Sequence, residues 1–278
     1  MNKIFNWGVV LEIQTKKFAV LIDADNSSIN AISSVLEEVA KYGIASVKRV
    51  YGDWSSETLK KWRDVLLPHA ITPVQQFAYT KGKDATDMIL IIDAMDLLYA
   101  GALDGFCIVS SDSDFTPLAS RIRENGLIVY GFGKKATPEA FKKACDKFIY
   151  IENLLADIEI KQQEDDESIN TQQKKILTSD KPLENKAIPQ NKENSDIAEL
   201  MDRATLNLIY KAVKDNTDEN GWANLSMVGQ YISAVKPDFD SRNYGRAKLS
   251  GLIKTLNLFE TKIEMSQMYL RKMKKQSN

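Results

Sequence analysis

Residues 18–28, FAVLIDADNSS, place two aspartates and an asparagine directly after a short apolar run. A run of this length that is bounded by polar residues is typical of a strand buried on both faces. Asp23 and Asp25 are two positions apart, so an extended chain would point both carboxylates to one side, where like charges repel. The stretch therefore predicts the first strand of a sheet that ends at a charged site.

Strand-like runs and helical patterns then alternate as far as residue 151. The runs SVKRVYG (46–52), GFCIVSS (105–111) and LIVYGFG (127–133) read as strands, and DATDMILIIDAMDLLYA (84–100) reads as a helix. Regular βα alternation favours a parallel sheet with its connecting helices on both faces. The sequence predicts an α/β fold with a mainly parallel sheet flanked by helices.

The composition changes beyond this unit. Residues 159–198 contain no aromatic residue and little that could be buried, which predicts a flexible linker between a domain at 1–158 and a second at 199–278. The second domain shows three helical stretches followed by an alternating run at 258–272, the pattern of a small winged helix. Residues 201–278 carry 13 Lys and Arg against 8 Asp and Glu, a net charge of +5.

The bulk composition excludes several classes of protein. The 278 residues carry a formal net charge of −1, so the whole chain is not a polycation. The two cysteines, Cys107 and Cys145, form no CxxC pair, which disfavours a disulfide framework and fits a reducing cytoplasm. The N-terminus lacks the pattern of a signal peptide, and no stretch reaches the ~18 apolar residues of a membrane span. We expect a cytoplasmic protein without membrane contact.

Three segments are expected to bring acids to one edge of the sheet, because ligand sites of open α/β sheets form outside the carboxyl ends of the strands. Clustered carboxylates repel unless a cation neutralises them, and Mg²⁺ prefers oxygen ligands. A metal held this way can activate water and stabilise a phosphodiester transition state. The acids are Asp23 and Asp25 after the first strand, Asp84 and Asp87 at the start of a helix, and Asp112 and Asp114 in SSDSDF (110–115).

Structural roles remain open for each of these acids. Asp23 and Asp25 could end a strand or cap the next helix, as could Asn26 and Ser28. Asp84, Asp87 and Asp114 could likewise be helix caps or first-turn acids favoured by the helix dipole. Asp93 and Asp96, further along the helix, are expected at the surface or behind the site.

Three of the quoted motifs carry a family resemblance. FAVLIDADN (18–26), KGKDATDMILIIDAMDLL (81–98) and IVSSDSDFTPLASRIRENGLIVYGFG (108–133) resemble the NYN domain, a PIN-like ribonuclease fold, in its LabA-like branch, over residues 17–155. The resemblance implies a metal-dependent ribonuclease with an acidic pocket for Mg²⁺ or Mn²⁺. Ser111 stands where many relatives have glycine. The implied catalytic and metal-binding residues are Asp23, Asp87, Asp112 and Asp114, and the implied secondary pocket residues are Asp25, Asn26, Asp84 and Ser110.

The C-terminal stretch is similar to a LOTUS domain, also called OST-HTH. The matching features are VGQ (228–230), KPDFD (236–240), NYGRAKLSGLI (243–253) and MYLRK (268–272). The family implies RNA binding or, in some members, docking of a protein partner. Basic side chains suit phosphates, and aromatic side chains near strand ends could stack bases of single-stranded RNA, although each could equally be solvated or packed. The candidate RNA contacts are Tyr51, Trp54, Lys134, Lys135, Arg242, Arg246 and Lys248.

The leading hypothesis is a metal-dependent endoribonuclease whose LOTUS domain recruits single-stranded RNA through the linker. A non-catalytic RNA-binding regulator is the main alternative. A haloacid-dehalogenase-like phosphatase is a further one, because DAD (23–25) suits an aspartyl nucleophile, but the threonine expected two residues later is missing and Ser27 is the nearest hydroxyl. The sequence does not decide whether cleavage is endonucleolytic or exonucleolytic. It also leaves open which ion binds, how many ions bind, and whether the protein forms a homo-oligomer.

Overall fold

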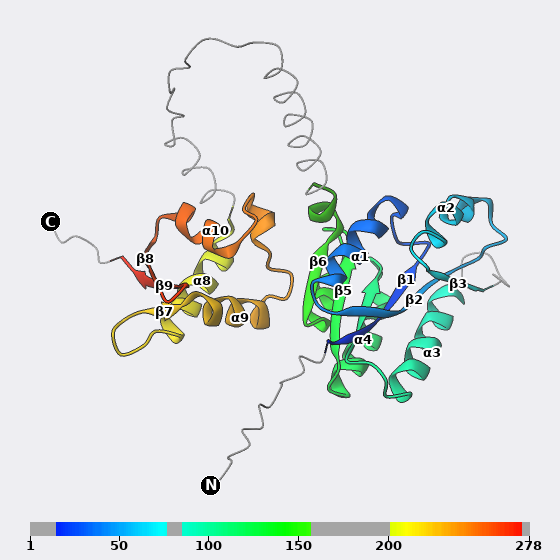
Figure 1. Ribbon diagram of the computed structural model, residues 1–278, viewed down its shortest axis with the longest axis horizontal. Coiled ribbons are helices and arrows are strands. Elements are labelled where there is room, and N and C mark those ends of the chain that lie inside the picture. Colours follow the sequence, from blue (N-terminus) through cyan, green and yellow to red (C-terminus); the bar gives the residue numbers. More distant parts are fainter. Residues whose placement is uncertain (1–14, 77–84, 157–200, 274–278) are drawn as a thin grey trace, which may run out of the picture.

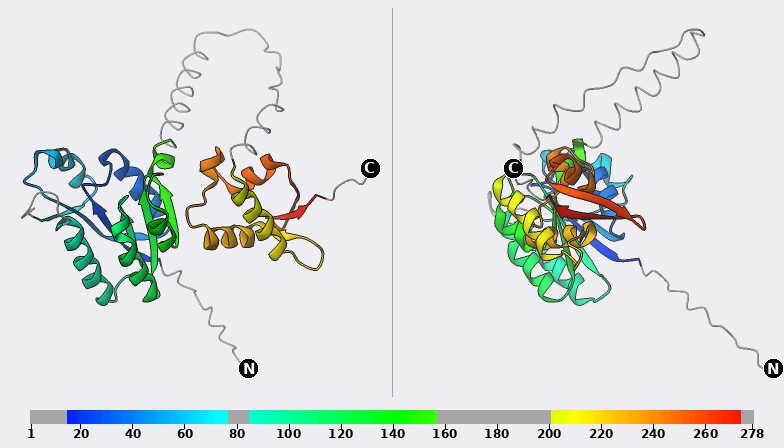
Figure 2. Two further views of the ribbon diagram at one scale, coloured as in Figure 1. Left: turned by 180° about the vertical axis from the view of Figure 1, so that it is seen from behind. Right: turned by 90° about the vertical axis from the view of Figure 1, so that its left-hand side faces the viewer.

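The computed structural model describes residues 15–76, 85–156 and 201–273, and it divides them between two domains that lie side by side (Figures 1 and 2). The larger domain ends at residue 156 and the smaller one begins at residue 201. The predicted linker at 159–198 lies outside the described residues, so the domain limits stay predictions. No helix of the described residues is long and apolar enough to cross a membrane.

The larger domain is built on a six-stranded sheet in the order β3–β2–β1–β4–β5–β6, and all of its strand pairings are parallel. Its central strand, β1, is buried from the second residue onward, as its apolar run predicts. This arrangement confirms the predicted mainly parallel α/β sheet. The strands are β1 (Lys17–Asp23), β2 (Ile44–Gly52), β3 (Thr72–Gln75), β4 (Gly105–Val109), β5 (Ile128–Gly133) and β6 (Lys147–Tyr150).

Alternate side chains of β1 enter the two separate cores on either face of the sheet. Val20 and Ile22 pack with the helices on one face, and Ala19 and Leu21 pack with those on the other. Helices α1 (Ile32–Ala40) and α2 (Arg63–Leu66) cover the first face, together with the short 3₁₀ helices η1 (Ile29–Ala31) and η2 (Glu57–Trp62). Helices α3 (Ala85–Tyr99), α4 (Thr116–Glu124) and α5 (Glu139–Ala144) cover the second face.

The strand order creates a crevice at the carboxyl ends of β1 and β4. The chain leaves β1 toward α1 on one face, and it leaves the neighbouring β4 toward α4 on the other. The two connections therefore diverge, and this topological switch point is where open α/β sheets bind their ligands. The predicted acidic segments at Asp23 and Asp112 follow these two strands.

The smaller domain packs three helices against a three-stranded antiparallel sheet in the order β7–β9–β8. The predicted winged helix is confirmed. Its third helix begins only at Leu249, because Gly245 adopts a left-handed conformation (φ 69°) that ends the preceding 3₁₀ turn. The elements are α8 (Arg203–Asp215), β7 (Ala223–Asn224), α9 (Leu225–Val235), η4 (Ser241–Tyr244), α10 (Leu249–Leu256), β8 (Phe259–Glu264) and β9 (Gln267–Lys272).

Candidate functional site

Asp23, the last residue of β1, has a fully buried carboxylate that holds two loops together. Its Oδ1 accepts the backbone N–H groups of Asp25 at 3.0 Å and Asn26 at 3.3 Å. Its Oδ2 accepts the hydroxyl of Ser110 at 2.7 Å, which the pairing of β1 with β4 brings alongside. Asp23 therefore fixes the course of the chain after both strands at the crevice.

The acids that follow β4 are ordered by the same network. The buried Ser110 hydroxyl accepts the backbone N–H of Asp112 at 3.1 Å. The Asp112 carboxylate then accepts the N–H of Asp114 at 2.9 Å and so caps the 3₁₀ turn η3 (Ser113–Phe115). The cap in this loop is thus Asp112 and not Asp114, whose side chain is left exposed at the rim of the crevice.

Two of the predicted acids from separate segments line one pocket. Asp87, in the first turn of α3, and Asp114 face a pocket of about 560 Å³. Its other lining residues are Met88, Ile91, Ser113, Thr116, Pro117 and Ala140. The expected meeting of the central helix with the loop after β4 is therefore observed. Asp84 lies outside the described residues.

The edge of the crevice is electronegative around Asp25. Partial burial raises the pKa of the Asp25 carboxyl, and the charges of Asp23 and Asp53 raise it further, whereas a hydrogen bond from Thr86 lowers it. Asp53, in the YGDW stretch, directly follows β2 at the same edge, and the sequence interpretation overlooked it. The signal was present, because Asp53 lies at the carboxyl end of a strand, as Asp23 does.

The donor chemistry at the crevice fits a hard divalent cation, since carboxylates and hydroxyls supply oxygen ligands. Within the described residues, however, no three acidic, histidine or cysteine side chains come close enough to hold a metal ion. The Asp23 carboxylate accepts three hydrogen bonds from the protein, and the Asp112 carboxylate accepts one. The joint binding of a metal by Asp23, Asp87, Asp112 and Asp114 stays a prediction.

Comparison with protein families identifies both domains. The family model of the NYN domain matches residues 17–152, and that of the OST-HTH/LOTUS domain matches residues 197–264. The chain carries an NYN domain followed by a LOTUS domain. The NYN domain is of the PIN-like nuclease type and the LOTUS domain is of an RNA-binding type, so their combination supports an RNA-related nuclease.

Two solved structures are similar to parts of this chain. The crystal structure of VPA0982, a protein of unknown function from Vibrio parahaemolyticus, is 18% identical with a TM-score of 0.41, and the match covers 50% of this chain and 94% of that one. The solution structure of an uncharacterized protein from locus NE0665 of Nitrosomonas europaea is 29% identical with a TM-score of 0.25, covering 37% and 95%. None of the curated proteins matches.

The expected stacking role of Tyr51 in the NYN domain is wrong. Its ring is fully buried on β2, and its hydroxyl donates to Asp93, which also pairs with Arg49. Trp54 is half-buried and donates its Nε1–H to the Val74 carbonyl at 2.9 Å. A base could reach only the exposed part of the Trp54 ring.

Lys134 and Lys135 follow β5 at the carboxyl edge of the NYN sheet, and both are exposed. The backbone N–H of Lys134 donates to the Ser111 hydroxyl at 3.0 Å. Ser111 therefore ties this basic loop to the loop after β4. Both lysines are placed where a phosphate near the acidic crevice could meet them.

The three basic candidates of the LOTUS domain differ in their environments. Arg242 is only 14% exposed and pairs with Glu38 of the NYN domain and with Asp240. Because this charge is engaged between the domains, the expectation that Arg242 contacts RNA is corrected. Arg246 is half-buried, and Lys248 is exposed.

A further basic and aromatic cluster lies on the LOTUS wing and was not predicted. The half-buried ring of Trp222 lies 4.5 Å from Lys262 and 4.5 Å from the guanidinium of Arg271. Lys262 also lies over Tyr269 of β9. The alternation of residues 258–272 predicted the hairpin, but only the pairing of β8 with β9 shows which side chains meet.

Proposed function

We propose that this chain is a metal-dependent ribonuclease that hydrolyses single-stranded RNA at the carboxyl edge of the NYN sheet, with RNA recruited by the LOTUS domain. The observation that carries the proposal is the shared pocket of Asp87 and Asp114, which come from separate segments and meet beside the loops that Asp23 orders. An acidic pocket at a switch-point crevice is a suitable place for cation-assisted phosphodiester chemistry.

The side chains divide into two groups by their surroundings. Asp87, Asp112 and Asp114 would hold Mg²⁺ or Mn²⁺, which when bound supplies an activated water and neutralises charge on the phosphate. Asp23 and Ser110 hold the two loops in position through their buried hydrogen bond. The exposed Lys134 and Lys135 would bind phosphates on either side of the reacting one.

The decisive experiment measures cleavage of a labelled single-stranded RNA in Mg²⁺, in Mn²⁺ and in EDTA. Asp114→Asn is the variant of choice, because the exposed Asp114 side chain makes no cap and its loss leaves the loop intact. We expect EDTA to abolish cleavage and the variant to lose roughly 100-fold or more in rate, because even the loss of a group that only supports a metal ligand costs about 10–100-fold. A circular RNA substrate tests for endonucleolytic cleavage, since it has no ends.

Asp96→Asn provides the matched control. Asp96 is exposed on the same helix as Asp87, nine residues further along and therefore ~13 Å away along the axis. The substitution removes the same charge outside the pocket, so it should leave the rate unchanged. Equal losses in Asp96→Asn and Asp114→Asn, or full cleavage in EDTA, would contradict the proposal.

The same experiment separates the alternatives. RNA binding without cleavage under every metal condition would favour a non-catalytic regulator. Release of phosphate from a small phosphomonoester would favour the phosphatase, but the aspartyl nucleophile of that mechanism must reach a phosphorus atom. Asp23 is 0% exposed and both of its oxygens accept hydrogen bonds, which disfavours that role. A homo-oligomer, a protein partner on the LOTUS domain and a cytoplasmic location remain predictions.

A further inference from the structure

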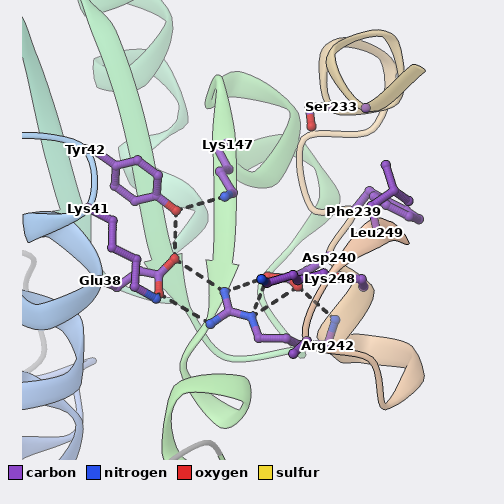
Figure 3. Close-up of a pocket in the computed structure, with 13 residues that line it drawn as sticks. Glu38, Lys41, Tyr42, Lys147, Ser233, Phe239, Asp240, Arg242, Lys248 and Leu249 are labelled. Carbon is purple, nitrogen blue, oxygen red and sulfur yellow. Dashed lines mark hydrogen bonds and ion pairs between the residues drawn. The ribbon is translucent and has the colours of Figure 1, made fainter. Parts of the chain in front are cut away.

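A cavity of about 800 Å³ lies between the NYN and LOTUS domains, at some distance from the acidic crevice (Figure 3). The end of α1 and the first residue of β6 form its NYN wall, and α9 with residues 239–249 forms its LOTUS wall. By the strand registers, Lys147 of β6 lies three strands and three residue levels from Asp23, roughly 17 Å away at ordinary sheet spacings. The cavity is therefore a second site.

The ionisable groups that line this cavity leave an excess of positive charge. Glu38 pairs with Lys41 at 2.6 Å and with Arg242 at 3.3 Å, and Arg242 also holds Asp240 at 2.7 Å. These two acids therefore already have cationic partners. Within the described part of the chain, no carboxylate pairs with the two remaining lining cations, Lys147 and Lys248. The six groups together carry a net charge of +2.

Lys147 is poorly solvated for a charged group. Its Nζ donates to the Tyr42 hydroxyl (Figure 3), at 2.8 Å. The same Nζ lies 5.0 Å from the centre of the Tyr42 ring. Burial lowers the pKa of Lys147, although the negative charges of Asp240 and Glu38 act against this. An ammonium with three donors and one neutral hydrogen-bond partner would be stabilised by an anion that accepts from the other donors.

We propose that this interdomain cavity binds a phosphodiester segment of single-stranded RNA, with Lys147 on the NYN wall and Lys248 on the LOTUS wall as its phosphate contacts. A volume of about 800 Å³ lies within the range of ordinary ligand pockets, so it accommodates a nucleotide. Tyr42 and Phe239 also line these walls. The inference rests on the proposed function for RNA as the source of the phosphate.

Binding in this cavity would connect the two domains through the substrate. One RNA strand that contacts both walls keeps the LOTUS domain docked. The same strand would continue along the β6 side of the sheet toward the exposed Lys134 and Lys135, which follow β5. The cavity then acts as a positioning site for RNA rather than as part of the cleavage machinery. Loss of its lysines should weaken binding and leave the chemistry of a bound strand unaltered.

The test uses full-length protein carrying Asp114→Asn, in EDTA, and measures fluorescence anisotropy of a labelled single-stranded RNA against salt concentration. This condition removes cleavage, so the result does not depend on nuclease activity. Lys147→Gln/Lys248→Gln should bind at least about tenfold more weakly, and the slope of log K against log salt should fall by about 1.4, which corresponds to two lost phosphate contacts. Lys248→Gln alone should lose about half of that slope.

Lys254→Gln is the control, because Lys254 is exposed on the same helix, α10, but does not line the cavity. It should leave the affinity and the slope at the values of the parent protein. The inference is overturned if the double variant keeps the parent affinity and slope, or if Lys254→Gln weakens binding as much. Free AMP that competes with RNA at equal molar concentration would also overturn it, since a mononucleotide would then be the ligand.

The experiment separates this inference from the proposed function. Weaker RNA binding by the double variant together with no cleavage by the unmodified protein would contradict the nuclease and support the RNA site. Cleavage that depends on Asp114 together with unchanged binding by the double variant would do the reverse. Hydrogen exchange of the Phe148 amide, which donates to the Pro237 carbonyl, shows whether the variants keep the domains docked.

Discussion

Arg242→Gln should loosen the docking of the LOTUS domain on the NYN domain. The Arg242 guanidinium meets the Glu38 carboxylate through two contacts, at 3.3 and 3.4 Å, and the two side chains are only 14% and 4% exposed. At an effective dielectric constant of about 20, two charges 3.3 Å apart attract by roughly 5 kcal/mol before desolvation is counted. Most of that attraction is offset, because both groups leave water.

The net loss is expected to be about 1–2 kcal/mol. Glu38 keeps Lys41 and Tyr42 as partners, so the substitution does not leave a bare buried charge. The remaining contacts between the domains include three hydrogen bonds, Phe148 to Pro237, Tyr150 to Asp238 and Asn153 to Asn243, each worth about 1 kcal/mol. A loss of about 1.4 kcal/mol would make the undocked state tenfold more populated.

Hydrogen exchange of one backbone amide reports the docking directly. The Phe148 N–H on the edge strand β6 donates to the Pro237 carbonyl at 3.0 Å, so it is protected only while the domains are docked. In Arg242→Gln it should exchange about tenfold faster, whereas amides of the central strand β4 should keep their rates. The exposed Arg203→Gln in the LOTUS domain is the matched control.

Glu38→Gln and the double variant complete a mutant cycle. Contacting partners should give a coupling energy of about 1 kcal/mol, because either substitution alone removes the same interaction. Phe148 exchange at the wild-type rate in Arg242→Gln would refute the reasoning. Strictly additive effects of the two substitutions would refute it as well, since the two side chains would then act independently.

Two other results are expected from buried carboxylates. Burial raises the pKa of Glu38, but hydrogen bonds from Lys41 and Tyr42 and the charge of Arg242 outweigh it and lower this pKa from 4.5 to about 2. The stability that Glu38 contributes is therefore complete above pH ~4.5 and is lost as the pH falls toward 2, and the free energy of unfolding in urea at a series of pH values should show a loss of roughly 3 kcal/mol. A flat profile between pH 5 and 3 would contradict this. Ser110→Ala removes the hydroxyl that donates to the buried Asp23 and should lower the free energy of unfolding by about 1–3 kcal/mol, and unchanged stability would show that the bond contributes nothing.

The sequence predicted the sheet because the information for it is local. Short apolar runs separated by helical patterns specify strands and crossovers without reference to distant residues, and β1 is buried as its run indicates. The local sequence pattern predicts helices less accurately where the chain forms 3₁₀ turns instead of α-helical ones. Residues 57–66 have a helical sequence pattern, but they form a 3₁₀ helix, η2, that continues into the four-residue α2. Sequence periodicity does not separate these two kinds of turn.

The side-chain partners across long separations could not be predicted. Arg242 was expected to meet RNA because it lies in a basic stretch, yet its partner Glu38 is 204 residues away. Tyr51 was expected to face a ligand because it ends a strand, but strand alternation does not say which face is covered, and α3 covers this one with Asp93. In both cases the decisive information is the packing of a second element, which a single stretch does not contain.

The burial of Asp23 changes the explanation of the charged stretch after β1. A carboxylate offers about four acceptor sites, and three protein donors already occupy Asp23, so its charge is largely compensated before any cation binds. Partial burial raises the pKa of the Asp25 carboxyl, and the charge of Asp23 raises it further. Asp87 and Asp114, which line the pocket at the rim, are the acids that we propose to bind the metal together with Asp112. The DAD stretch (23–25) therefore orders the loops around the crevice, while Asp87 of the central helix and Asp114 of the loop after β4 line its pocket.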